Sequence, residues 1–599
     1  MSILTASTFA VGLQFDTMKD LRLACKALAI QENFEIKTDY ADKKRYRIHC
    51  ISSETCPWRL HASLITSDKT SSSSIVEIKA LTSEHTCNGV RTAHHRQAGA
   101  SMVSAAIQGR LRDQPTYRPV EVVRDILREQ GVKVSYSTAW RAKEDASTTI
   151  NGSHEEAYAR LPQYCTDLLQ ANPGSTIQLE CTVTNNFRRL FISYAASAKG
   201  FGDCRPVLGI DGAHLKGKYL GILLSATAVD ANGSLFPLAH AVVDAENDDN
   251  WNWFISLLHN IIEEYASAYL APTFLTFVSD RQKGLLESIE QIFPGSPHGY
   301  CLRHLYENLH KNYKHPDLQR FLYEAARAKT EQEYNNAIEQ MRGINSDAVD
   351  WLLTHAAPKH WCEYYFPGHR YGHITSNIAE SINAWLLDAR EKPIIAMLEQ
   401  IRHQLMEWFA ARRQIDQNTE GILVSSVAKI IKDMLTTRAR RYRVIQSNGA
   451  VYEVFSPETI STYVVRLDTE TCTCYEWQMS GIPCGHVLAV GLGCGDDSQT
   501  YAKAFYRLDA YRGIYSDSIF PPNVNATNTA DIATTATIIP IIQPNSIIVL
   551  PPNTRRPPGR PKKQRIRGAR EGGGRAKRIF RCSRCGNTGH SRQSCKGPI

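Results

Sequence analysis

The sequence contains no uninterrupted apolar run of the about 18 residues that a membrane-spanning helix requires. Its longest candidate, Ile538–Leu550, is broken by Pro540 and Pro544. The first residues, Met1–Gln14, lack the basic start and sustained apolar core of a secretory signal. We therefore expect a soluble intracellular protein that has no membrane partner.

Cysteine is not arranged as in a disulfide-rich protein, although the chain has 16 cysteines. Disulfide frameworks belong mainly to short secreted chains, and this chain has 599 residues. Nine of the cysteines instead lie with histidine in three clusters that have the spacing of metal ligands. This pattern favours zinc sites over disulfide bonds.

Acidic residues are almost absent between Arg555 and Arg592, where lysine and arginine are dense. The net charge of the whole chain, +9, is mild for its length, so the local block is the informative feature. Such a block usually contacts a polyanion, most often nucleic acid.

Composition and hydrophobic periodicity divide the chain into six regions. The first reads as a helix followed by short alternating strands, and the second as two helices separated by a turn at Gly131. Helix, turn and helix in this order are a weak indication of DNA binding, and a plain helical hairpin is the alternative. The regions are an N-terminal zinc-binding unit (1–98), a helical unit (99–160), a central unit (161–423), a smaller Cys/His unit (424–518), a disordered linker (519–579) and a zinc knuckle (580–599).

The central unit has the pattern of an α/β layer fold. Three apolar segments, Pro206–Ile210, Tyr219–Val229 and Ser234–Val243, read as strands, and an Asn-Gly turn joins the last two. Helices and strands then alternate as far as Tyr313. From Asp317 to about Ala357 the pattern is helical throughout, which predicts an all-α insertion over about residues 315–373.

Two aspartates of this unit stand at the C-terminal ends of apolar strands. Asp211 follows Pro206–Ile210, and Asp280 follows a strand that ends near Val278. Carboxylates at such ends can converge at one edge of a sheet, and their oxygens suit Mg²⁺ or Mn²⁺. Glu380, on an expected helix, is a third candidate. Taken singly, each acid could equally be a turn or cap residue.

Three longer stretches of this unit are more specific than any single acid. They are residues 208–254, which begin with LGIDGAHLKG, residues 277–309, which begin with FVSDRQKG, and residues 375–394, which begin with TSNIAESINAW. Together they closely resemble the transposases of Mutator-like elements, which belong to the Asp-Asp-Glu superfamily. The resemblance runs from about Val11 to the C-terminus and implies a ribonuclease-H-like catalytic fold. It also implies that Asp211, Asp280 and Glu380 are the catalytic acids.

Cys301 and His304 form a C-x₂-H pair just after the second aspartate, a further mark that resembles this family. Two ligands cannot close a tetrahedral zinc site, and such residues at a helix start are usually packing and cap residues. The resemblance implies a structural role near the active site. Whether the pair binds zinc stays open.

Two clusters towards the C-terminus have four ligands each at zinc spacing. The first, C-x-C-x₉-C-x-H, looks like a SWIM-type zinc finger, a usual companion of this catalytic domain. The second, C-x₂-C-x₄-H-x₄-C, has the spacing of a zinc knuckle, which grips single-stranded nucleic acid, and protein contact is its alternative role. The ligands are Cys472, Cys474, Cys484 and His486 in the first cluster and Cys582, Cys585, His590 and Cys595 in the second.

A third and looser cluster lies among the expected N-terminal strands. It resembles the WRKY-like DNA-binding domain of the same transposases, and buried cysteines with a surface histidine are the alternative. Basic residues nearby could contact phosphates or enter the major groove, and a charged solvated strand is the alternative. The cluster is Cys50, Cys56, His85 and Cys87, and the basic residues are Lys43, Lys44, Arg45 and Arg47.

The C-terminal basic block contains a Gly-Arg-Pro core flanked by further cations. It looks like an AT-hook, in which an extended Arg-Pro segment fits a narrow A·T minor groove. The same residues could serve as a nuclear import signal, and a solubilising linker is a third interpretation. The cations are Arg556, Arg560, Lys562 and Lys563.

The sequence thus predicts a nuclear, multidomain α/β protein with a ribonuclease-H-like core, an all-α insertion and small zinc-binding modules. We expect a DNA transposase that holds Zn²⁺ at two or three sites and Mg²⁺ or Mn²⁺ at its active site. It would cut and join double-stranded DNA at terminal inverted repeats, by two-metal hydrolysis and transesterification into target DNA, as a homodimer or larger synaptic assembly. The alternative is a domesticated, transposase-derived regulator of transcription that binds DNA without cutting it.

Overall fold

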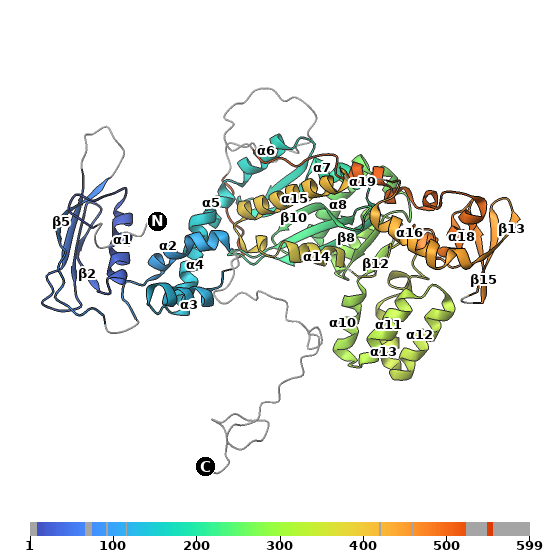
Figure 1. Cartoon of the computed structure of the whole chain (residues 1–599), viewed down its shortest axis with the longest axis horizontal. Coiled ribbons are helices and arrows are strands. Elements are labelled where there is room, and N and C mark those ends of the chain that lie inside the picture. The colour runs from blue at the N-terminus through green and yellow to red at the C-terminus, as the bar shows by residue number, and fades with distance from the viewer. Residues whose placement is uncertain are drawn as a thin grey trace, which may run out of the picture. The chain divides into compact units, whose positions relative to one another are not determined.

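The computed structural model describes residues 9–65, 75–90, 94–114, 117–375, 377–417, 421–457, 460–522 and 548–554. The chain divides into two compact units, Met1–Arg556 and Pro557–Ile599, and every described residue belongs to the first. Within the described ranges, no helix is both long enough and apolar enough to cross a membrane. Figure 1 shows the chain and labels many of its helices and strands.

The N-terminal sheet has one face covered by a helix. The side chain of Thr17 caps α1 by accepting a 3.2 Å hydrogen bond from the backbone N–H of Asp20. Buried and exposed residues alternate along the central strands, so one face packs against α1 and the other carries polar side chains. The helix and strands expected here are confirmed. The sheet has the order β1-β5-β4-β3-β2, and the elements are β1 Gln14–Phe15, α1 Met18–Gln31, β2 Ile36–Ala41, β3 Arg45–Cys50, β4 Arg59–Leu64 and β5 Val76–Thr82.

Helices with a small core of their own follow this sheet. Gly131 ends α3 in the left-handed conformation with a φ of 69°, and Ser135 caps α4. α3 and α4 therefore have the expected order of helix, turn and helix, and DNA binding by them stays a prediction. The helices are α2 Ala100–Asp113, α3 Pro119–Gln130, α4 Tyr136–Asn151, α5 His154–Ala159 and α6 Leu161–Ala171.

The largest sheet has the strand order β12-β11-β8-β9-β10-β7-β6. The strands β8, β9 and β10 form antiparallel pairs, as expected, whereas β11 and β12 run parallel to β8. Every residue of β9 is buried, so both faces of the sheet are covered. The antiparallel pair β6–β7, which extends the sheet beyond β10, is not among the strands expected from the sequence. The strands are β6 Thr176–Cys181, β7 Phe187–Ser193, β8 Arg205–His214, β9 Ile222–Val229, β10 Leu235–Val243, β11 Thr276–Ser279 and β12 His298–Tyr300.

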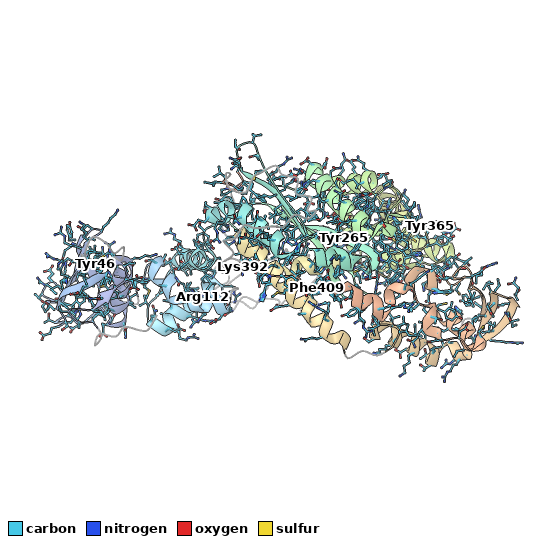
Figure 2. The ribbon with its side chains drawn as sticks, turned by 90° about the horizontal axis from the view of Figure 1, so that it is seen from above. Tyr46, Arg112, Tyr265, Tyr365, Lys392 and Phe409 are labelled. Atoms are coloured by element: carbon cyan, nitrogen blue, oxygen red, sulfur yellow. The ribbon has the colours of Figure 1, made fainter. Side chains whose placement is uncertain are left out.

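Helices on the two faces of this sheet complete the central layer. Figure 2 labels Phe409 on the long helix α15 and Tyr265 at the end of α8. Phe409 is fully buried, and its ring centroid lies 5.6 Å from that of Phe236 on β10, so α15 packs directly on the sheet. The elements are α7 Ala195–Phe201, α8 Asp248–Tyr265, η2 Ser267–Leu270, α9 Lys283–Ile292, α14 Asn377–Trp385, η4 Ala389–Glu391 and α15 Ile394–Gln417.

The segment between β12 and α14 is helical wherever it has regular structure. Its helices lie together in Figure 1 and share a hydrophobic core that is separate from that of the large sheet. The helices expected from Asp317 to about Ala357 are therefore confirmed. The elements are α10 Leu302–Asn312, α11 Pro316–Arg327, α12 Glu331–Ile344, α13 Ser346–His355 and η3 Pro358–His360.

A small antiparallel sheet with the order β13-β14-β15-β16 follows α15. Its buried residues, such as Val454 and Val465, belong to the same hydrophobic cluster as those of the large sheet. The segments Val451–Phe455 and Tyr463–Leu467, which the sequence predicts as strands, correspond to β14 and β15, and β13 and β16 are additional. The elements are α16 Ser425–Thr437, η5 Ala439–Arg441, β13 Arg443–Asn448, β14 Val451–Ser456, β15 Ser461–Arg466, β16 Thr471–Cys472, α17 Glu476–Ser480, α18 Gly485–Cys494, η6 Ser498–Tyr501, η7 Ala504–Tyr506 and α19 Leu508–Ile514.

One short stretch departs from the disordered linker expected over residues 519–579. The backbone N–H of Leu550 donates to the carbonyl of Asn185, and the carbonyl of Leu550 accepts from the N–H of Phe187, both at 2.8 Å. Val549 is 1% exposed and joins the main core. The turn between β6 and β7 leaves backbone groups unpaired, and this apolar stretch satisfies them.

Candidate active site and metal centres

Asp211 and Asp280 come from neighbouring parallel strands. Asp211 lies in β8, and Asp280 follows the last residue of β11. Val278 of β11 pairs with Gly209 of β8, so continuing this register by two residues brings Asp280 level with Asp211. Neighbouring strands lie about 4.8 Å apart. The two carboxylates therefore share one edge of the sheet, as carboxylates that bind common divalent ions must.

The carboxyl group of Asp211 lies in an environment that disfavours its charge. Burial raises its pKa to about 7, and the charges of Asp280 and Glu380 contribute to the rise. The backbone N–H of Gly212, which donates to Oδ1 at 2.9 Å, opposes the rise. Since the charges of both other acids act on Asp211, the three predicted catalytic acids lie in one region of the fold. Among the described residues, the groups of ligand atoms within 4.8 Å of one another include Glu380 with Cys301 and His304, but not with the two aspartates.

Asn383 holds the second oxygen of Asp211. Its Nδ2 donates to Oδ2 of Asp211 at 2.7 Å, and the residue lies three positions after Glu380 on α14. Arg390 donates to the backbone carbonyl of Asn383 at 3.0 Å and to that of His214, the last residue of β8, at 3.2 Å. These hydrogen bonds fasten the end of α14 to the strand that carries Asp211.

Glu380 faces the first turn of α10. Its carboxylate forms an ion pair with Arg303 and lies 4.0 Å from Nε2 of His304. A hydrogen bond with Cys301 raises the pKa of His304 to about 9 despite partial burial, and the nearby carboxylates add to the rise. The ligand atoms of Cys301, His304 and Glu380 all lie within 4.8 Å of one another. The C-x₂-H pair thus borders the predicted catalytic acid, and the three groups together could hold a metal ion.

A fourth carboxylate, that of Glu246, precedes α8 near the same edge. Burial raises the pKa of Glu246, and the charge of Asp280 contributes. The start of α8 packs tightly on the start of α9, because a Cβ added to Gly284 would clash with the carboxylate of Asp248. This packing brings the segment of Glu246 next to the segment of Asp280.

The C-terminal Cys/His cluster is assembled from a strand end and a helix start. Cys472 ends β16, Cys474 lies in the turn before α17, and Cys484 and His486 begin α18. Nδ1 of His486 lies 3.7 Å from Sγ of Cys472 and 3.8 Å from Sγ of Cys484. The ligand atoms of all four residues lie within 4.8 Å of one another, which fits a tetrahedral metal ion.

Two tyrosine rings fix the imidazole of this cluster. The rings of Tyr463 and Tyr442 stack on His486, with centroids at 4.0 Å and 4.9 Å. His486 is 8% exposed. Hydrogen bonds with the other two thiols lower the pKa of Cys474 well below its ordinary value. A thiolate at Cys474 is the form that binds a metal ion.

The N-terminal cluster also converges. Sγ of Cys50 lies 3.7 Å from that of Cys87, and Sγ of Cys56 lies 3.4 Å from Nδ1 of His85. Burial raises the pKa of Cys56, but hydrogen bonds from the backbone and from His85 outweigh it and bring the pKa to about 6. The ring of His85 stacks on Trp58 at 5.5 Å. All four groups lie within 4.8 Å of one another and fit a single metal ion.

The basic residues beside this cluster are exposed. Lys43 and Lys44 lie in the turn between β2 and β3, and Arg45 and Arg47 lie on β3. Arg45 forms an ion pair of 3.8 Å with Asp42. Whether these cations contact DNA stays a prediction.

Two predicted sites fall outside the described residues. They are the zinc knuckle, Cys582, Cys585, His590 and Cys595, and the AT-hook-like cations Arg556, Arg560, Lys562 and Lys563.

The structure adds residues that the sequence did not single out. Asn383 could have been found, because a residue three positions after Glu380 shares its helix face. Arg303 lies inside the C-x₂-H motif and could have been found there. Nothing local marks Arg390 or Glu246, since their roles depend on segments far apart in the chain.

Three family models match the chain. The MULE transposase domain matches residues 207–308, the MuDR family transposase matches residues 7–72, and the SWIM zinc finger matches residues 463–490. The first match covers both Asp211 and Asp280, and the third covers all four ligands of the C-terminal cluster. Among curated proteins, none matches the chain.

Proposed function

The chain belongs to the transposases of Mutator-like elements and carries a SWIM zinc finger, and from this premise we propose that it cuts and joins DNA at the ends of an element. The observation that carries the proposal is that Asp211 and Asp280 share one edge of the large sheet and that α14, which carries Glu380, is hydrogen-bonded to Asp211 through Asn383. Each acid comes from a different element, so only the folded chain brings them into one region.

The proposal includes a ribonuclease-H-like core with a helical insertion. Its support is the order of elements: β8 opens a three-stranded antiparallel run, and β11 then pairs with β8 in parallel. The helices α10 to α13 intervene before α14, which carries Glu380. The acids therefore lie on β8, directly after β11 and on α14.

The three acids form a donor set of carboxylate oxygens, which is the set that Mg²⁺ and Mn²⁺ prefer. Divalent ions bound there would activate the attacking oxygen and stabilise the leaving one. Asn383 orients the Asp211 carboxylate for this task, and Arg390 keeps α14 in register with β8. Arg303 holds Glu380 against α10.

The reaction would consist of two displacements at phosphorus. Water attacks the phosphodiester at the element end, and the 3′-oxygen leaves as a free 3′-OH. That hydroxyl then attacks a phosphodiester of target DNA, where it forms the new bond and displaces the target's own 3′-oxygen. Because two ends must be joined, we propose that the chain works as a homodimer or larger assembly, in the nucleus.

The Cys/His clusters would hold Zn²⁺ and build the DNA-contact modules. The donor sets of three thiols and one imidazole suit structural zinc. We propose that the N-terminal unit recognises terminal inverted repeats, with Lys43, Lys44, Arg45 and Arg47 contacting the duplex.

The test is strand cleavage on DNA that carries the inverted repeats flanking the encoding locus. Wild type is compared with Asp280→Asn and with Asp317→Asn, a matched change at an exposed aspartate of α11. Mg²⁺-dependent nicking at the repeat boundary should disappear in Asp280→Asn and persist in Asp317→Asn. Repeat binding without nicking by wild type, with zinc retained, would instead indicate the domesticated regulator.

A further inference from the structure

A dense group of arginines lies at the surface beside the SWIM zinc finger. Residues 425–448 contain six lysines and arginines and a single acid, Asp433. Four of the cations fall within six positions of the chain, and all four are exposed. We call them the arginine patch: Arg438, Arg440, Arg441 and Arg443.

The fold forces these side chains outward. The segment from Arg438 to Arg443 contains two other residues, Ala439 and Tyr442. Ala439 is 2% exposed and seats η5 against α16 and α18. Tyr442 is half-buried, and its ring stacks on His486. With these two positions used as anchors, the arginines between and beside them project from the surface.

The same anchors tie the patch to the zinc finger. A Cβ added to Gly485 would lie 3.1 Å from the ring of Tyr442 and 3.6 Å from Cβ of Arg438. Gly485 lies between the ligands Cys484 and His486. Arg438 and Tyr442 thus lie against the helix start that completes the zinc finger, so the backbone that carries the arginines is anchored there.

Most of the positive charge of the patch has no paired acid among the described residues. Across the described residues, Arg438, Arg440 and Arg443 form no ion pair with a carboxylate. Concentrated charge of one sign destabilises a folded protein through self-repulsion and attracts a partner of opposite charge. The patch therefore has a cost for the fold that a bound polyanion would offset.

We propose that the arginine patch binds the phosphate backbone of duplex DNA, as a contact surface additional to the N-terminal unit. The inference rests on the proposed function only in taking DNA as the polyanion. Arginine presents a planar fork of donors that matches phosphate oxygens. Contacts to phosphate position a protein on the duplex and carry no sequence information. The patch would therefore bind duplex DNA of any sequence, which includes target DNA as well as element ends.

The test uses the full-length, zinc-loaded protein and a fluorescent duplex of unrelated sequence, with affinity measured over a series of KCl concentrations. The variant is the triple change Arg438→Gln, Arg440→Gln and Arg443→Gln. The slope of log affinity against log salt should become shallower by about 2 to 3, since each phosphate contact contributes about 0.9. Affinity at low salt should fall by roughly tenfold or more.

Two matched variants make this result specific. A triple change of Lys311, Lys314 and Lys359 to Gln removes the same charge from exposed positions on the helical segment and should leave the slope unchanged. Changing the same three arginines to Lys keeps the charge and should keep most of the slope. If the glutamine triple unfolds or loses zinc, the single variant Arg440→Gln decides, with an expected decrease in slope of about 0.9.

A slope for the patch variant that equals wild type would overturn the proposal. So would a variant that binds DNA normally and only fails to accumulate in the nucleus, because the patch would then be an import signal. Binding to an unrelated duplex is measured without Mg²⁺ and needs no cleavage. An inactive catalytic site would therefore leave this result unchanged.

Discussion

The side-chain amide of Asn383 donates a 2.7 Å hydrogen bond to Oδ2 of Asp211, although 172 residues separate the two in the chain. Asn383 is 9% exposed, and its backbone carbonyl accepts from Arg390. The helix that carries Glu380 therefore also orients the first aspartate. One element thus controls two of the three acids, and a small displacement of α14 would disturb both.

We expect Asn383→Ala to weaken metal-dependent cleavage without unfolding the chain. The Asp211 carboxylate would lose a donor that fixes its orientation, and removing such a supporting contact typically costs about 10- to 100-fold in metal affinity or activity. The measurement is the cleavage rate over a Mg²⁺ titration, in which the concentration for half-maximal rate should rise. Asn336→Ala, the same change at an exposed position of α12, is the control. Identical Mg²⁺ titrations for the two variants would rule out this role.

The pKa of Asp211 predicts a pH-dependent stability difference. Its folded pKa is about 7, against an ordinary value of 3.8, so the folded chain keeps a proton that the unfolded chain releases between these values. The stability that this group contributes is fully present below the lower value and is lost as the pH rises through about 7. Asp211→Asn cannot ionise and should escape this loss.

Without added Mg²⁺, Asp211→Asn should therefore be more stable than wild type near about pH 8, by up to a few kcal/mol. The difference should shrink as the pH falls and become small below about pH 3, where the wild-type carboxyl is protonated in both states. Thermal unfolding across this pH range measures it, with Asp317→Asn as the control. A difference that is constant with pH would contradict the assigned cause.

Zinc binding by the SWIM cluster predicts a contrast between two cysteines of the same helix. Cys484→Ser should lose one Zn²⁺ per chain, because Cys484 completes a set of ligand atoms that lie within 4.8 Å of one another. Cys494→Ser, at the exposed end of α18, should keep the full zinc content. Elemental analysis of the purified chains gives the count. Loss of zinc from both variants, or from neither, would count against the assigned ligands.

The strands and helices that the sequence predicts best are those whose pattern is local. β8, β9 and β10 are apolar runs, and an Asn-Gly turn separates the last two. The two Cys/His clusters that lie among the described residues could be predicted equally well, because ligand spacing is itself a sequence property. In both cases the information lies within a few residues of the element that it specifies.

The features that escaped prediction depend on partners far along the chain. Nothing in the local sequence distinguishes Asn383 or Glu246 from other polar residues. Asn383 reaches Asp211 only because α14 packs beside β8, and Glu246 comes near Asp280 only because α8 packs on α9. Val549 lies in a stretch that resembles linker and is buried only because the β6–β7 turn offers backbone partners. Tertiary packing decides each of these positions.

The junction between α7 and α19 gives a test of the fold that is independent of catalysis. A Cβ added to Gly200 on α7 would clash with the backbone carbonyl of Ile514, at the end of α19, and would lie 3.1 Å from the ring of Phe236. The backbone of Ile514 cannot move aside as easily as the end of a flexible side chain could. We therefore expect Gly200→Ala to destabilise the chain by about 1 to 3 kcal/mol, the usual cost of overpacking.

Gly343→Ala is the matched change, since Gly343 lies on α12 and an added Cβ would meet nothing within 4 Å. Alanine favours a helix over glycine by about 1 kcal/mol, so this variant should be as stable as wild type or slightly more stable. Urea unfolding of both variants, followed by circular dichroism, separates the two effects. Midpoints that shift in the same direction would show that α7 and α19 are not packed as closely as the structure has them. Destabilisation of Gly200→Ala without destabilisation of Gly343→Ala would instead establish that the region after the zinc finger is packed into the central layer.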